Sequence, residues 1–500
     1  MAASNTIVGV SAPRDSRILL LLQKCCSFPV SLGVLLVAFN GCIILSSLRL
    51  EPDTWWHIKF GEEILTAGQW AKLDAYSFTA YGHNQLSFEW LGEVALALAY
   101  RLGHLQGLEL LLLVLTSTIL LLLYYYAYLQ CGNFKAAFCG TLLVSLLAAL
   151  CFTLRPQLIG YIFLLITLIC LERYRQGIQK SLWVLPFIFL IWVNTHGSFA
   201  LGLFVFGLYW VSGLVEFSWG GLVAERWRPD QRIHLALIFL LSILVLPLTP
   251  YGASAAIFPI EKALYFPLSG ARINEWQPLN FSQLQPKIAL FCLLGFASAQ
   301  TLSRTAYRLQ TFGLFVFAAY AAAVHTRFII LFAVAFAPVA ATMLSRRTSP
   351  YQPANDRYAV NSLLILVLAM GLVRYFPSQA ELGNKVAKDY PVQAVEYLQQ
   401  HRVPGPMFND YGFGGYLIWT MGPDHKVFID GRGDFYEYAG VLSDYFSITD
   451  IKPQGLTLLD FYGIRSCLTS NGDPLATLLR ARNDWQEVYR DKLAVLFVRR

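Results

Sequence analysis

Residues 29–48 read PVSLGVLLVAFNGCIILSSL, and the polar segment Glu51-Pro52-Asp53-Thr54-Trp55-Trp56-His57 follows almost directly. About 20 consecutive apolar residues allow a helix to cross a bilayer. A carboxylate and a histidine at the end of such a run are costly near lipid, so they need a functional or structural reason. This stretch therefore predicts a first membrane-spanning helix that ends at a polar surface with a possible chemical role.

The composition extends this prediction to most of the chain. Of the 500 residues, 56% are hydrophobic and 14% are charged, and the mean hydropathy is +0.50. Soluble domains carry about 25% charged residues, so a soluble fold of this length is not expected. The net charge of +7 comes without a basic tract, which argues against nucleic-acid binding. The nine cysteines form no Cys-x-x-Cys pair, so neither a disulfide framework nor a zinc site is indicated.

Apolar runs long enough, or nearly long enough, to span a membrane recur along the first three quarters of the chain. They lie at about 29–48, 108–129, 136–153, 157–172, 181–193, 198–216, 234–249, 287–302, 309–324, 328–345 and 359–373. The stretch 90–103 is also apolar but carries Glu93 and Arg101, so it is predicted to be an interfacial helix. The predicted fold class is a polytopic α-helical membrane protein with about eleven transmembrane helices.

Basic residues mark every second connection between these runs. They are Lys135; Arg173, Arg175 and Lys180; Arg226, Arg228 and Arg232; Arg304 and Arg308; and Arg346, Arg347 and Arg357. Because Lys and Arg accumulate in cytoplasmic loops, the N-terminus is predicted to be cytoplasmic and the protein to cross the inner or plasma membrane. The large first external loop, 51–107, then faces outward, as does the C-terminal region.

The composition shifts toward charged residues after residue 375. Short β-like runs at 406–409, 426–430, 466–470 and 494–499 alternate there with helix-like runs at 390–400 and 475–482. This alternation predicts a small α/β domain. The chain is therefore divided into a cytoplasmic N-terminus (1–28), a transmembrane domain (29–375) and an extracytoplasmic α/β domain (376–500).

The polar residues of the outer turns suggest one cleft that opens outward. Asp53 could act as a general base, with His57 about one helical turn away as the alternative. Arg155 and Arg327 lie at outer helix ends, where a positive charge has no role in orienting the chain, and each could bind a phosphate group. The alternatives are that Asp53 caps a helix end beside two interfacial tryptophans, and that each arginine reaches out to lipid headgroups.

Further polar residues could contact an acceptor or a sugar. They are Glu89, Asp74, His196, Asp410, Tyr411, Asp430 and Arg432. The last four lie next to glycine-rich turns, which can present side chains to a ligand. The alternatives are that the loop acids are merely solvated, that His196 caps a helix end, and that Asp430 and Arg432 form a structural ion pair. A divalent metal would suit such acids, but no metal-binding motif is evident, so the cofactor stays open.

Four short segments resemble the GT-C superfamily of membrane glycosyltransferases, which includes the protein O-mannosyltransferases and the lipid A aminoarabinose transferase. They are Asp53-Thr54-Trp55-Trp56-His57-Ile58, Asp74-Ala75-Tyr76-Ser77, Asn409-Asp410-Tyr411-Gly412 and Ile429-Asp430-Gly431-Arg432, and they are most similar to poorly characterised bacterial members. The resemblance implies that Asp53 is the acidic residue that follows the first helix in this superfamily. It also implies a polyprenyl-phosphate sugar as donor.

The sequence thus predicts a membrane glycosyltransferase that acts on the outer face, with Asp53 as general base and a glycan, lipid or protein as acceptor. The alternatives are a lipid or solute transporter and a non-catalytic membrane scaffold. A transporter favours internal repeats and broken helices at mid-membrane, whereas no repeat is evident here and the polar residues cluster at one face. Geometry separates these hypotheses, because an enzyme needs Asp53, Arg155 and Arg327 to line one cavity.

Overall fold

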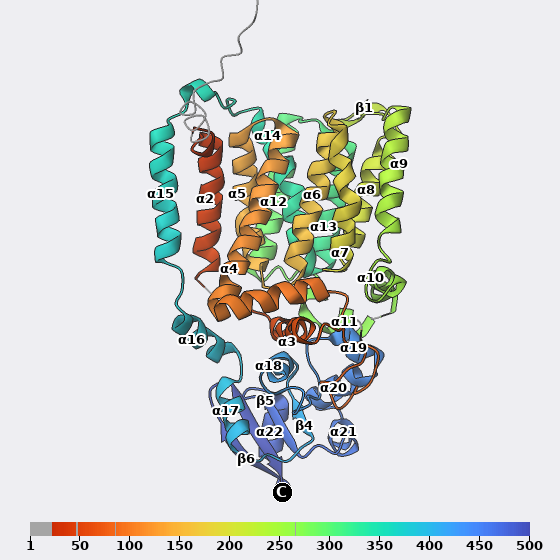
Figure 1. Cartoon of the computed structure of the whole chain (residues 1–500), viewed down its shortest axis with the longest axis vertical. Helices are drawn as coiled ribbons and strands as arrows, with labels where there is room; N and C mark the ends of the chain where they lie inside the picture. The colour runs from red at the N-terminus through yellow and green to blue at the C-terminus, as the bar shows by residue number, and fades with distance from the viewer. Residues whose placement is uncertain (1–22, 47–48, 86, 266) are drawn as a thin grey trace, which may run out of the picture.

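The computed structural model describes residues 23–46, 49–85, 87–265 and 267–500. Upright helices form a bundle, and a mixed α/β unit, the C-terminal domain, lies beyond one end of it (Figure 1). Between the two lie α3 (Pro52–Ala67) and the first part of α4 (Trp90–Cys131), both running across the end of the bundle. Most of the predicted N-terminal segment 1–28 falls outside the described residues, as do residues 47 and 48 of the first predicted span.

Each predicted span coincides with a helix or with a pair of consecutive helices. These are α2 (Phe28–Ile44), the second part of α4, α5 (Phe134–Cys151), α6 (Gln157–Arg175), η1 (Gln179–Val184) with α7 (Leu185–Val193), α8 (Phe199–Ser212), α9 (Pro229–Leu244), α12 (Leu284–Ser303), α13 (Leu309–Val324), α14 (Ile329–Ser345) and α15 (Tyr358–Arg374). By length and composition alone, three of the described helices could cross a membrane unaided. A fourth is added if α15 and α16 (Gln379–Asp389), bent by 59°, count as one span. The positions of the helices are confirmed, and the number of crossings stays a prediction.

The stretch 90–103, predicted to be an interfacial helix, forms the first part of α4. The backbone breaks at His104, where φ is 49° and ψ is −134°. This part of α4 lies across the end of the bundle, and the remainder runs upright within it (Figure 1). The bend keeps Glu93 and Arg101 out of the bundle interior.

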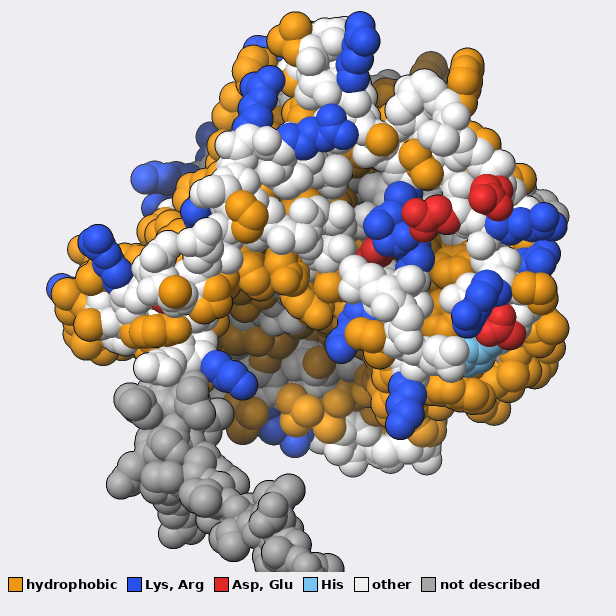
Figure 2. Space-filling view, turned by 90° about the horizontal axis from the view of Figure 1, so that it is seen from above, with side chains coloured by type: hydrophobic (Ala, Val, Ile, Leu, Met, Phe, Trp, Pro, Cys, Tyr) orange, Lys and Arg blue, Asp and Glu red, His pale blue; other side chains and the backbone are white. Residues whose placement is uncertain are grey.

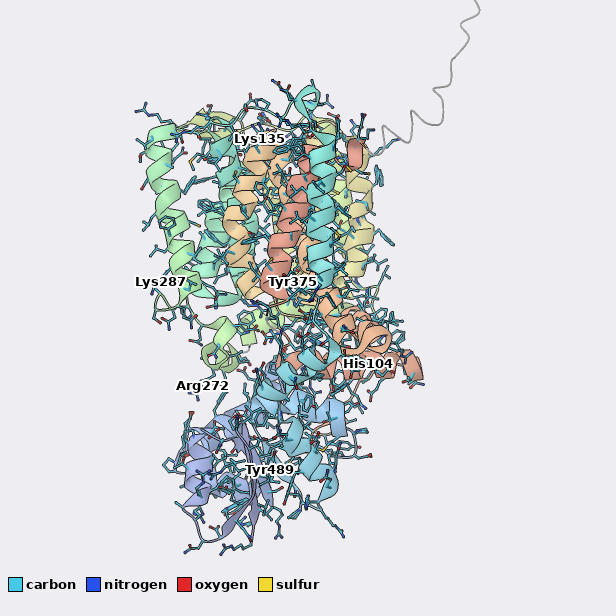
Figure 3. All side chains as sticks on the ribbon, turned by 90° about the vertical axis from the view of Figure 1, so that its left-hand side faces the viewer. His104, Lys135, Arg272, Lys287, Tyr375 and Tyr489 are labelled. Carbon is cyan, nitrogen blue, oxygen red and sulfur yellow. The ribbon has the colours of Figure 1, made fainter. Side chains whose placement is uncertain are left out.

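The basic loops gather at the end of the bundle that is remote from the C-terminal domain. Figure 2 shows this end from above, with Lys and Arg side chains spread over it and few Asp or Glu side chains. Figure 3 places Lys135 at this end and Tyr489 in the C-terminal domain. The connections predicted to be basic therefore lie at one end of the bundle. The assignment of this end to the cytoplasm stays a prediction.

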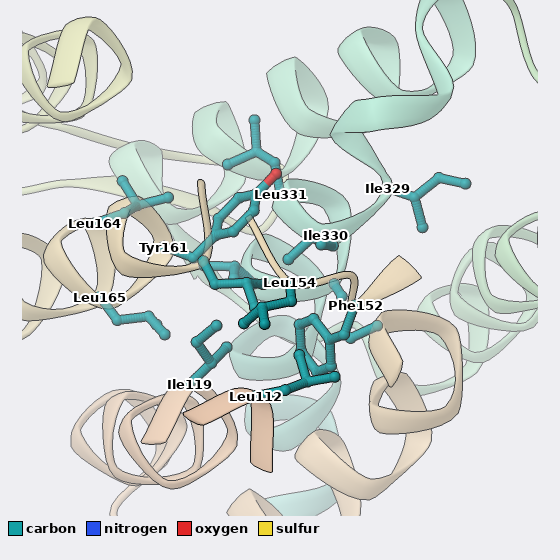
Figure 4. Packing of buried hydrophobic residues seen from close by; sticks show 14 of the residues in the cluster. Leu112, Ile119, Phe152, Leu154, Tyr161, Leu164, Leu165, Ile329, Ile330 and Leu331 are labelled. Atoms are coloured by element: carbon teal, nitrogen blue, oxygen red, sulfur yellow. The ribbon is translucent and has the colours of Figure 1, made fainter. Parts of the chain in front are cut away.

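The centre of the bundle is apolar. Helix α14 buries every residue from Ile329 to Ala341, as expected for a helix that is hydrophobic on all sides. Figure 4 shows Ile330 and Leu331 beside Leu154 and Tyr161 in this core. The segment around Leu154 thus begins in the packed core and leads directly to Arg155.

The C-terminal domain is an α/β unit, as predicted. Its four-stranded sheet has the order β4-β5-β7-β6, where β4 is parallel to β5 and the other pairs are antiparallel. The strands are β4 (Met407–Asn409), β5 (Ser466–Ser470), β6 (Trp485–Arg490) and β7 (Ala494–Arg499). The helices are α17 (Val392–Gln400), α18 (Tyr411–Met421), α19 (Gly433–Tyr438), α20 (Val441–Thr449), α21 (Gly455–Phe461) and α22 (Pro474–Arg480).

The predicted strand at 426–430 is wrong. Val427 bonds instead to the first loop: its N–H donates to Tyr76 O at 2.9 Å, and its carbonyl accepts from Phe78 N at 3.1 Å. The side chain of Asn409 accepts from the backbone N–H of Phe428 at 2.7 Å and donates to Ile429 O at 2.8 Å. The missed strand is β6, whose Gln486 and Arg490 face solvent at the edge of the sheet, so its sequence lacks a run of β-forming apolar residues.

Trp55 joins α3 to the C-terminal domain. Its side chain is 1% exposed, and its ring lies 5.3 Å from that of Tyr390, 5.1 Å from Tyr416 and 4.7 Å from Trp419. The view of Trp55 as an interfacial tryptophan is therefore wrong. Burial of this aromatic cluster holds the C-terminal domain over the start of α3, where Asp53 lies.

Candidate active site

A cavity of about 1110 Å³ lies between the end of the bundle, α3 and the C-terminal domain. Asp53, Arg155 and Arg327 all line it, as the enzyme hypothesis required. The connections on the bundle side of the cavity include α10 (Ala253–Tyr265), α11 (Pro267–Arg272), η2 (Asn274–Trp276) and η3 (Thr326–Phe328).

The start of α3 sets the position of Asp53. Glu51 is the N-cap, and Asp53 lies in the first turn, where the helix dipole favours a negative charge. Thr54 Oγ1 accepts from the backbone N–H of Glu51 at 3.1 Å and donates to Leu154 O at 2.8 Å. This second bond ties α3 to the segment that carries Arg155, so two residues 102 positions apart in the chain become neighbours.

Arg155 is surrounded by three carboxylates. Its guanidinium lies 2.8 Å from Asp53 Oδ2, 3.0 Å from Glu51 Oε2 and 2.7 Å from Glu275 Oε2. Trp56 Nε1 donates to the other oxygen of Asp53 at 3.2 Å. Burial raises the pKa of Asp53 above its ordinary value, and Arg155 offsets only part of that effect. Asp53 is therefore oriented by two donors and is a stronger base, once ionised, than a solvated carboxylate.

Arg327 contacts the Glu275 carboxylate that also pairs with Arg155. Thr326 N donates to Gln277 O at 2.9 Å, which pairs η3 with the chain just after Trp276. The guanidinium of Arg327 lies 4.1 Å from the centre of the Trp276 ring and 3.4 Å from Glu275 Oε1. Glu275 thus sits between two guanidinium groups. The spacing of those groups suits an anion that bridges them.

Two histidines flank Glu89 in another wall of the cavity. His57 Nε2 lies 3.7 Å from one oxygen of Glu89, and His196 Nε2 lies 3.4 Å from the other. Because His196 Nδ1 accepts from the backbone N–H of Ser198 at 3.0 Å, its proton resides on Nε2 and faces Glu89. Burial lowers the pKa of His57 to about 4, so it is neutral at ordinary pH. His196 thus satisfies a nearby backbone group, as its structural alternative required, and also lines the cavity.

Arg432 holds a buried cluster that links the C-terminal domain to the first loop. It lies 2.5 Å from Asp430 Oδ2 and 2.8 Å from Asp74 Oδ1, and it donates to Gln85 Oε1 at 2.6 Å. Tyr436 OH also donates to Asp430 at 2.6 Å. Asp430 is 0% exposed and Asp74 is 1% exposed. Neither carboxylate lines the cavity, whereas Arg432 does. This geometry favours the structural ion pair over the acceptor contact for Asp430 and Arg432, and Asp74 is not a solvated loop acid.

Asp410 has a structural position too, whereas Tyr411 reaches the cavity. Asp410 is the N-cap of α18, accepting from Gly412 N at 2.8 Å and from Ser470 Oγ at 2.9 Å, and it does not line the cavity. Tyr411 lines the cavity and donates its hydroxyl to Gly431 O at 2.9 Å. Of the residues expected to contact an acceptor, Glu89, His196, Tyr411 and Arg432 therefore reach the cavity.

Gly431 packs its backbone directly against Asp53. A Cβ at this position would overlap Asp53 Oδ1 and would lie close to Trp56 Nε1. Glycine is needed here because the backbone of Gly431 approaches the Asp53 side chain closely. Its φ angle is not in the left-handed region, so backbone conformation does not require glycine. The C-terminal domain thus forms the wall of the cavity behind Asp53.

Gly431→Ala should lower activity by about 100-fold, because a displacement of about 1 Å in a reacting group is enough for such a loss. The change should be measured as the rate of sugar transfer at saturating donor, together with the melting temperature. Gly472→Ala is the matched control, since nothing lies within 4 Å of its added Cβ. Equal activity of the two variants would contradict this prediction, because it would show that the Asp53 side chain can move away from the added methyl group without loss of activity.

Several cavity residues were not assigned a role from the sequence. Glu275 and Trp276 form an acid–tryptophan pair between two apolar runs, which is the same signal that singled out Asp53, so they could have been found. Arg272 and Tyr438 carry no such signal: Tyr438 belongs to the C-terminal domain, and Arg272 pairs with Asp450 of that domain at 2.7 Å. In the part of the chain that the structure describes, no group of three or more His, Cys, Asp and Glu side chains is suited to a metal ion.

Comparison with known proteins identifies the architecture. No family model matches the chain, and no curated protein matches its sequence. ArnT from Cupriavidus metallidurans, bound to undecaprenyl phosphate, superposes with a TM-score of 0.50 over 97% of this chain and 98% of that chain, at 15% identity. The chain has the GT-C fold.

Two further structures are similar to this chain at slightly lower scores. ArnT from Cupriavidus metallidurans in the apo state matches with a TM-score of 0.49 at 15% identity, over 97% of this chain and 98% of that chain. The archaeal oligosaccharyltransferase AglB from Archaeoglobus fulgidus, in complex with an inhibitory peptide and a dolichol-phosphate, matches with a TM-score of 0.49 at 10% identity. That match covers 88% of this chain and 69% of AglB.

Proposed function

We propose that the large cavity is the active site of a membrane glycosyltransferase that moves a sugar from a polyprenyl-phosphate donor to an acceptor on the outer face. The observation that carries this proposal is the grouping of Asp53, Arg155 and Arg327 around Glu275 in one cavity. The GT-C fold supports it, and so does undecaprenyl phosphate in the ArnT structure. A transporter or a scaffold has no need for a base beside two anion-binding side chains.

The donor phosphate is assigned to the position between Arg155 and Arg327. Glu275 occupies that position here, 2.7 Å from the first guanidinium and 3.4 Å from the second. An incoming phosphate would replace the Glu275 carboxylate, because like charges repel and each guanidinium fits phosphate oxygens with two parallel donors. Movement of Arg155 toward the phosphate would also release Asp53 Oδ2 from its 2.8 Å ion pair. Donor binding and activation of the base are therefore coupled through one side chain.

Transfer then proceeds by displacement at the anomeric carbon. The acceptor hydroxyl loses its proton to Asp53 as its oxygen bonds to the sugar, and the bond between the sugar and the phosphate oxygen breaks. The lipid phosphate leaves with additional negative charge, which Arg155 and Arg327 stabilise. His57 is the alternative base, since its neutral imidazole can also accept a proton.

The acceptor is assigned to the side of the cavity formed by the C-terminal domain. Tyr411, Phe435 and Tyr438 line that side, and Tyr438 is 74% exposed. Aromatic faces of this kind suit the apolar face of a sugar ring. Glu89, held by His57 and His196, can accept hydrogen bonds from hydroxyl groups on the opposite wall.

The proposed function is tested with the purified full-length protein in lipid nanodiscs and a panel of polyprenyl-phosphate sugars with candidate acceptors. One polyprenyl phosphate should be released for each sugar that joins an acceptor. Donor lipid that crosses the bilayer of proteoliposomes with no release of lipid phosphate would identify a transporter instead. Absence of both binding and release across the panel would favour the scaffold.

Arg327→Ala should raise the donor KM by about 10- to 100-fold, the range expected for hydrogen bonds to a charged group. Arg327→Lys should have a smaller effect, since it retains the charge and loses the two-pronged geometry. The measurement is initial rate against donor concentration. Arg101→Ala is the matched control, because Arg101 pairs with Glu62 outside the cavity. Unchanged donor KM in both Arg327 variants would leave Arg327 as an anchor for lipid headgroups.

A further inference from the structure

A second cavity lies at the basic end of the bundle, opposite the proposed active site. It has a volume of about 130 Å³ and is lined by Arg175, Arg226 and Arg308 together with Glu225 and Gln310. The end of α6, the end of α8 and the starts of α9 and α13 surround it. A small sheet of β1 (Phe217–Trp219), β2 (Leu222–Ala224) and β3 (Tyr307–Arg308) closes one side. This is the end of the molecule that Figure 2 shows from above.

A buried carboxylate fixes two of the three arginines. Glu172 is 0% exposed and accepts from Arg175 Nη2 at 2.8 Å, from Arg308 Nη1 at 3.0 Å and from Gln130 Nε2 at 3.0 Å. A buried charge must be paired in this way, so Glu172 holds Arg175 and Arg308 in place beside the cavity that both of them line. These two arginines are thereby held in place at the cavity, which lowers the entropic cost of binding an anion there.

The Glu225 carboxylate, which pairs with Arg175 at the mouth of the cavity, can be displaced by another anion. Arg175 Nη1 lies 2.9 Å from Glu225 Oε2, but the Glu225 side chain is 64% exposed, and exposed ion pairs are weak. Arg226 is also exposed and adds a third positive charge. Gln310 belongs to the first turn of α13, whose sixteen residues direct a helix N-terminus at the same point. An anion that displaces Glu225 would meet three guanidinium groups and this helix start.

Exposed aromatic side chains lie on the strand beside the cavity. Trp219 is 80% exposed and Phe217 is 38% exposed, and both belong to the strand paired with β2. Exposed aromatic residues at the end of a helix bundle are typical of the membrane–water interface. The strand β2 contributes Val223 to the cavity lining, so these aromatic residues and the cavity belong to adjacent strands.

We propose that this second cavity is a binding site for a phosphate group, supplied by the headgroup of an anionic lipid or by a soluble phosphate compound. One water needs about 10–15 Å³ of such volume, so about 130 Å³ is sufficient for a phosphate group. The site is separate from the proposed active site and does not depend on the proposed function. Basic pockets between helices on the inner side of a membrane protein are suited to anionic headgroups.

The test uses the full-length protein in detergent micelles, with two probes. Bound phosphatidylglycerol is compared with phosphatidylcholine by native mass spectrometry, and inorganic phosphate is titrated by calorimetry. Arg226→Ala should weaken binding about fivefold, as expected for about 1 kcal/mol per basic residue near a lipid phosphate. Glu225→Gln should strengthen binding several-fold, because it removes the competing carboxylate.

Arg228→Ala is the matched control. Arg228 is two residues from Arg226, its side chain is 65% exposed, and it pairs with Asp230 outside the cavity. Retention of phosphatidylglycerol alone would identify a lipid site, and binding of inorganic phosphate would identify a soluble ligand. The proposal is overturned if neither probe binds, if Arg226→Ala and Arg228→Ala act equally, or if Glu225→Gln leaves the affinity unchanged. All three variants change exposed side chains, so loss of folding does not obscure the result.

Discussion

Asp53→Asn should lower the rate of sugar transfer by about 10²- to 10⁴-fold without loss of folded protein. Asparagine retains the shape of the side chain and can still accept from Trp56 Nε1, but it cannot take a proton from the acceptor hydroxyl. The rate should be measured as release of polyprenyl phosphate in a single turnover, so that product dissociation does not mask the chemical step. Glu62→Gln is the matched control, since it lies on the same helix and pairs with Arg101 away from the cavity.

The pH dependence of the reaction provides a second test of the same assignment. The base must be ionised, and burial raises the pKa of Asp53, so activity should be lost on acidification at a pH above that of an ordinary carboxyl group. Arg155→Ala removes the charge that partly offsets burial, so it should shift this loss to still higher pH. If His57 were the base, the loss would instead centre near pH 4. Near-parental turnover of Asp53→Asn would transfer the role to His57 or Glu89.

Arg432→Met should lower the free energy of unfolding by about 3–5 kcal/mol, because it leaves two buried carboxylates without their positive partner. Asp430 and Asp74 are both almost fully buried, and each lies within 2.8 Å of Arg432. The contact with Asp74 joins the C-terminal domain to the first loop, so both parts should loosen together. Thermal or denaturant melting of the purified full-length protein measures the effect.

Arg499→Ala is the control for this loss of stability. Arg499 pairs with Asp460 at 2.6 Å, but Asp460 is 59% exposed. Exposed pairs contribute about 0–1 kcal/mol, so Arg499→Ala should melt close to the parent. An unchanged melting curve for Arg432→Met, combined with a higher acceptor KM, would restore the acceptor-binding role that the sequence suggested for Arg432 and Asp430.

The comparison of Asp53 with Asp430 shows which part of the site can be predicted from the sequence. Both acids lie in polar segments beside glycines or tryptophans, and both were candidates for contact with substrate. Asp53 follows a long apolar run almost directly, so its position at an end of the helical bundle follows from local sequence alone. Asp430 belongs to the C-terminal α/β domain, where only packing decides whether a carboxylate is exposed, and here Arg432 and Tyr436 bury it.

The sequence by itself determined the helical runs, the basic connections and the placement of Asp53, Arg155 and Arg327 at ends of apolar runs that are remote from those basic connections. These features are local, because hydrophobic length and loop charge act within single segments of the chain. Tertiary structure alone decided that Glu275 bridges Arg155 and Arg327, that Trp55 is buried, and that Gly431 abuts Asp53. Each of these depends on the docking of the C-terminal domain or on contacts between loops far apart in the chain, such as Asp74 with Arg432, which are 358 residues apart. Such contacts are set by shape and charge complementarity between distant surfaces, which no local pattern of residues encodes.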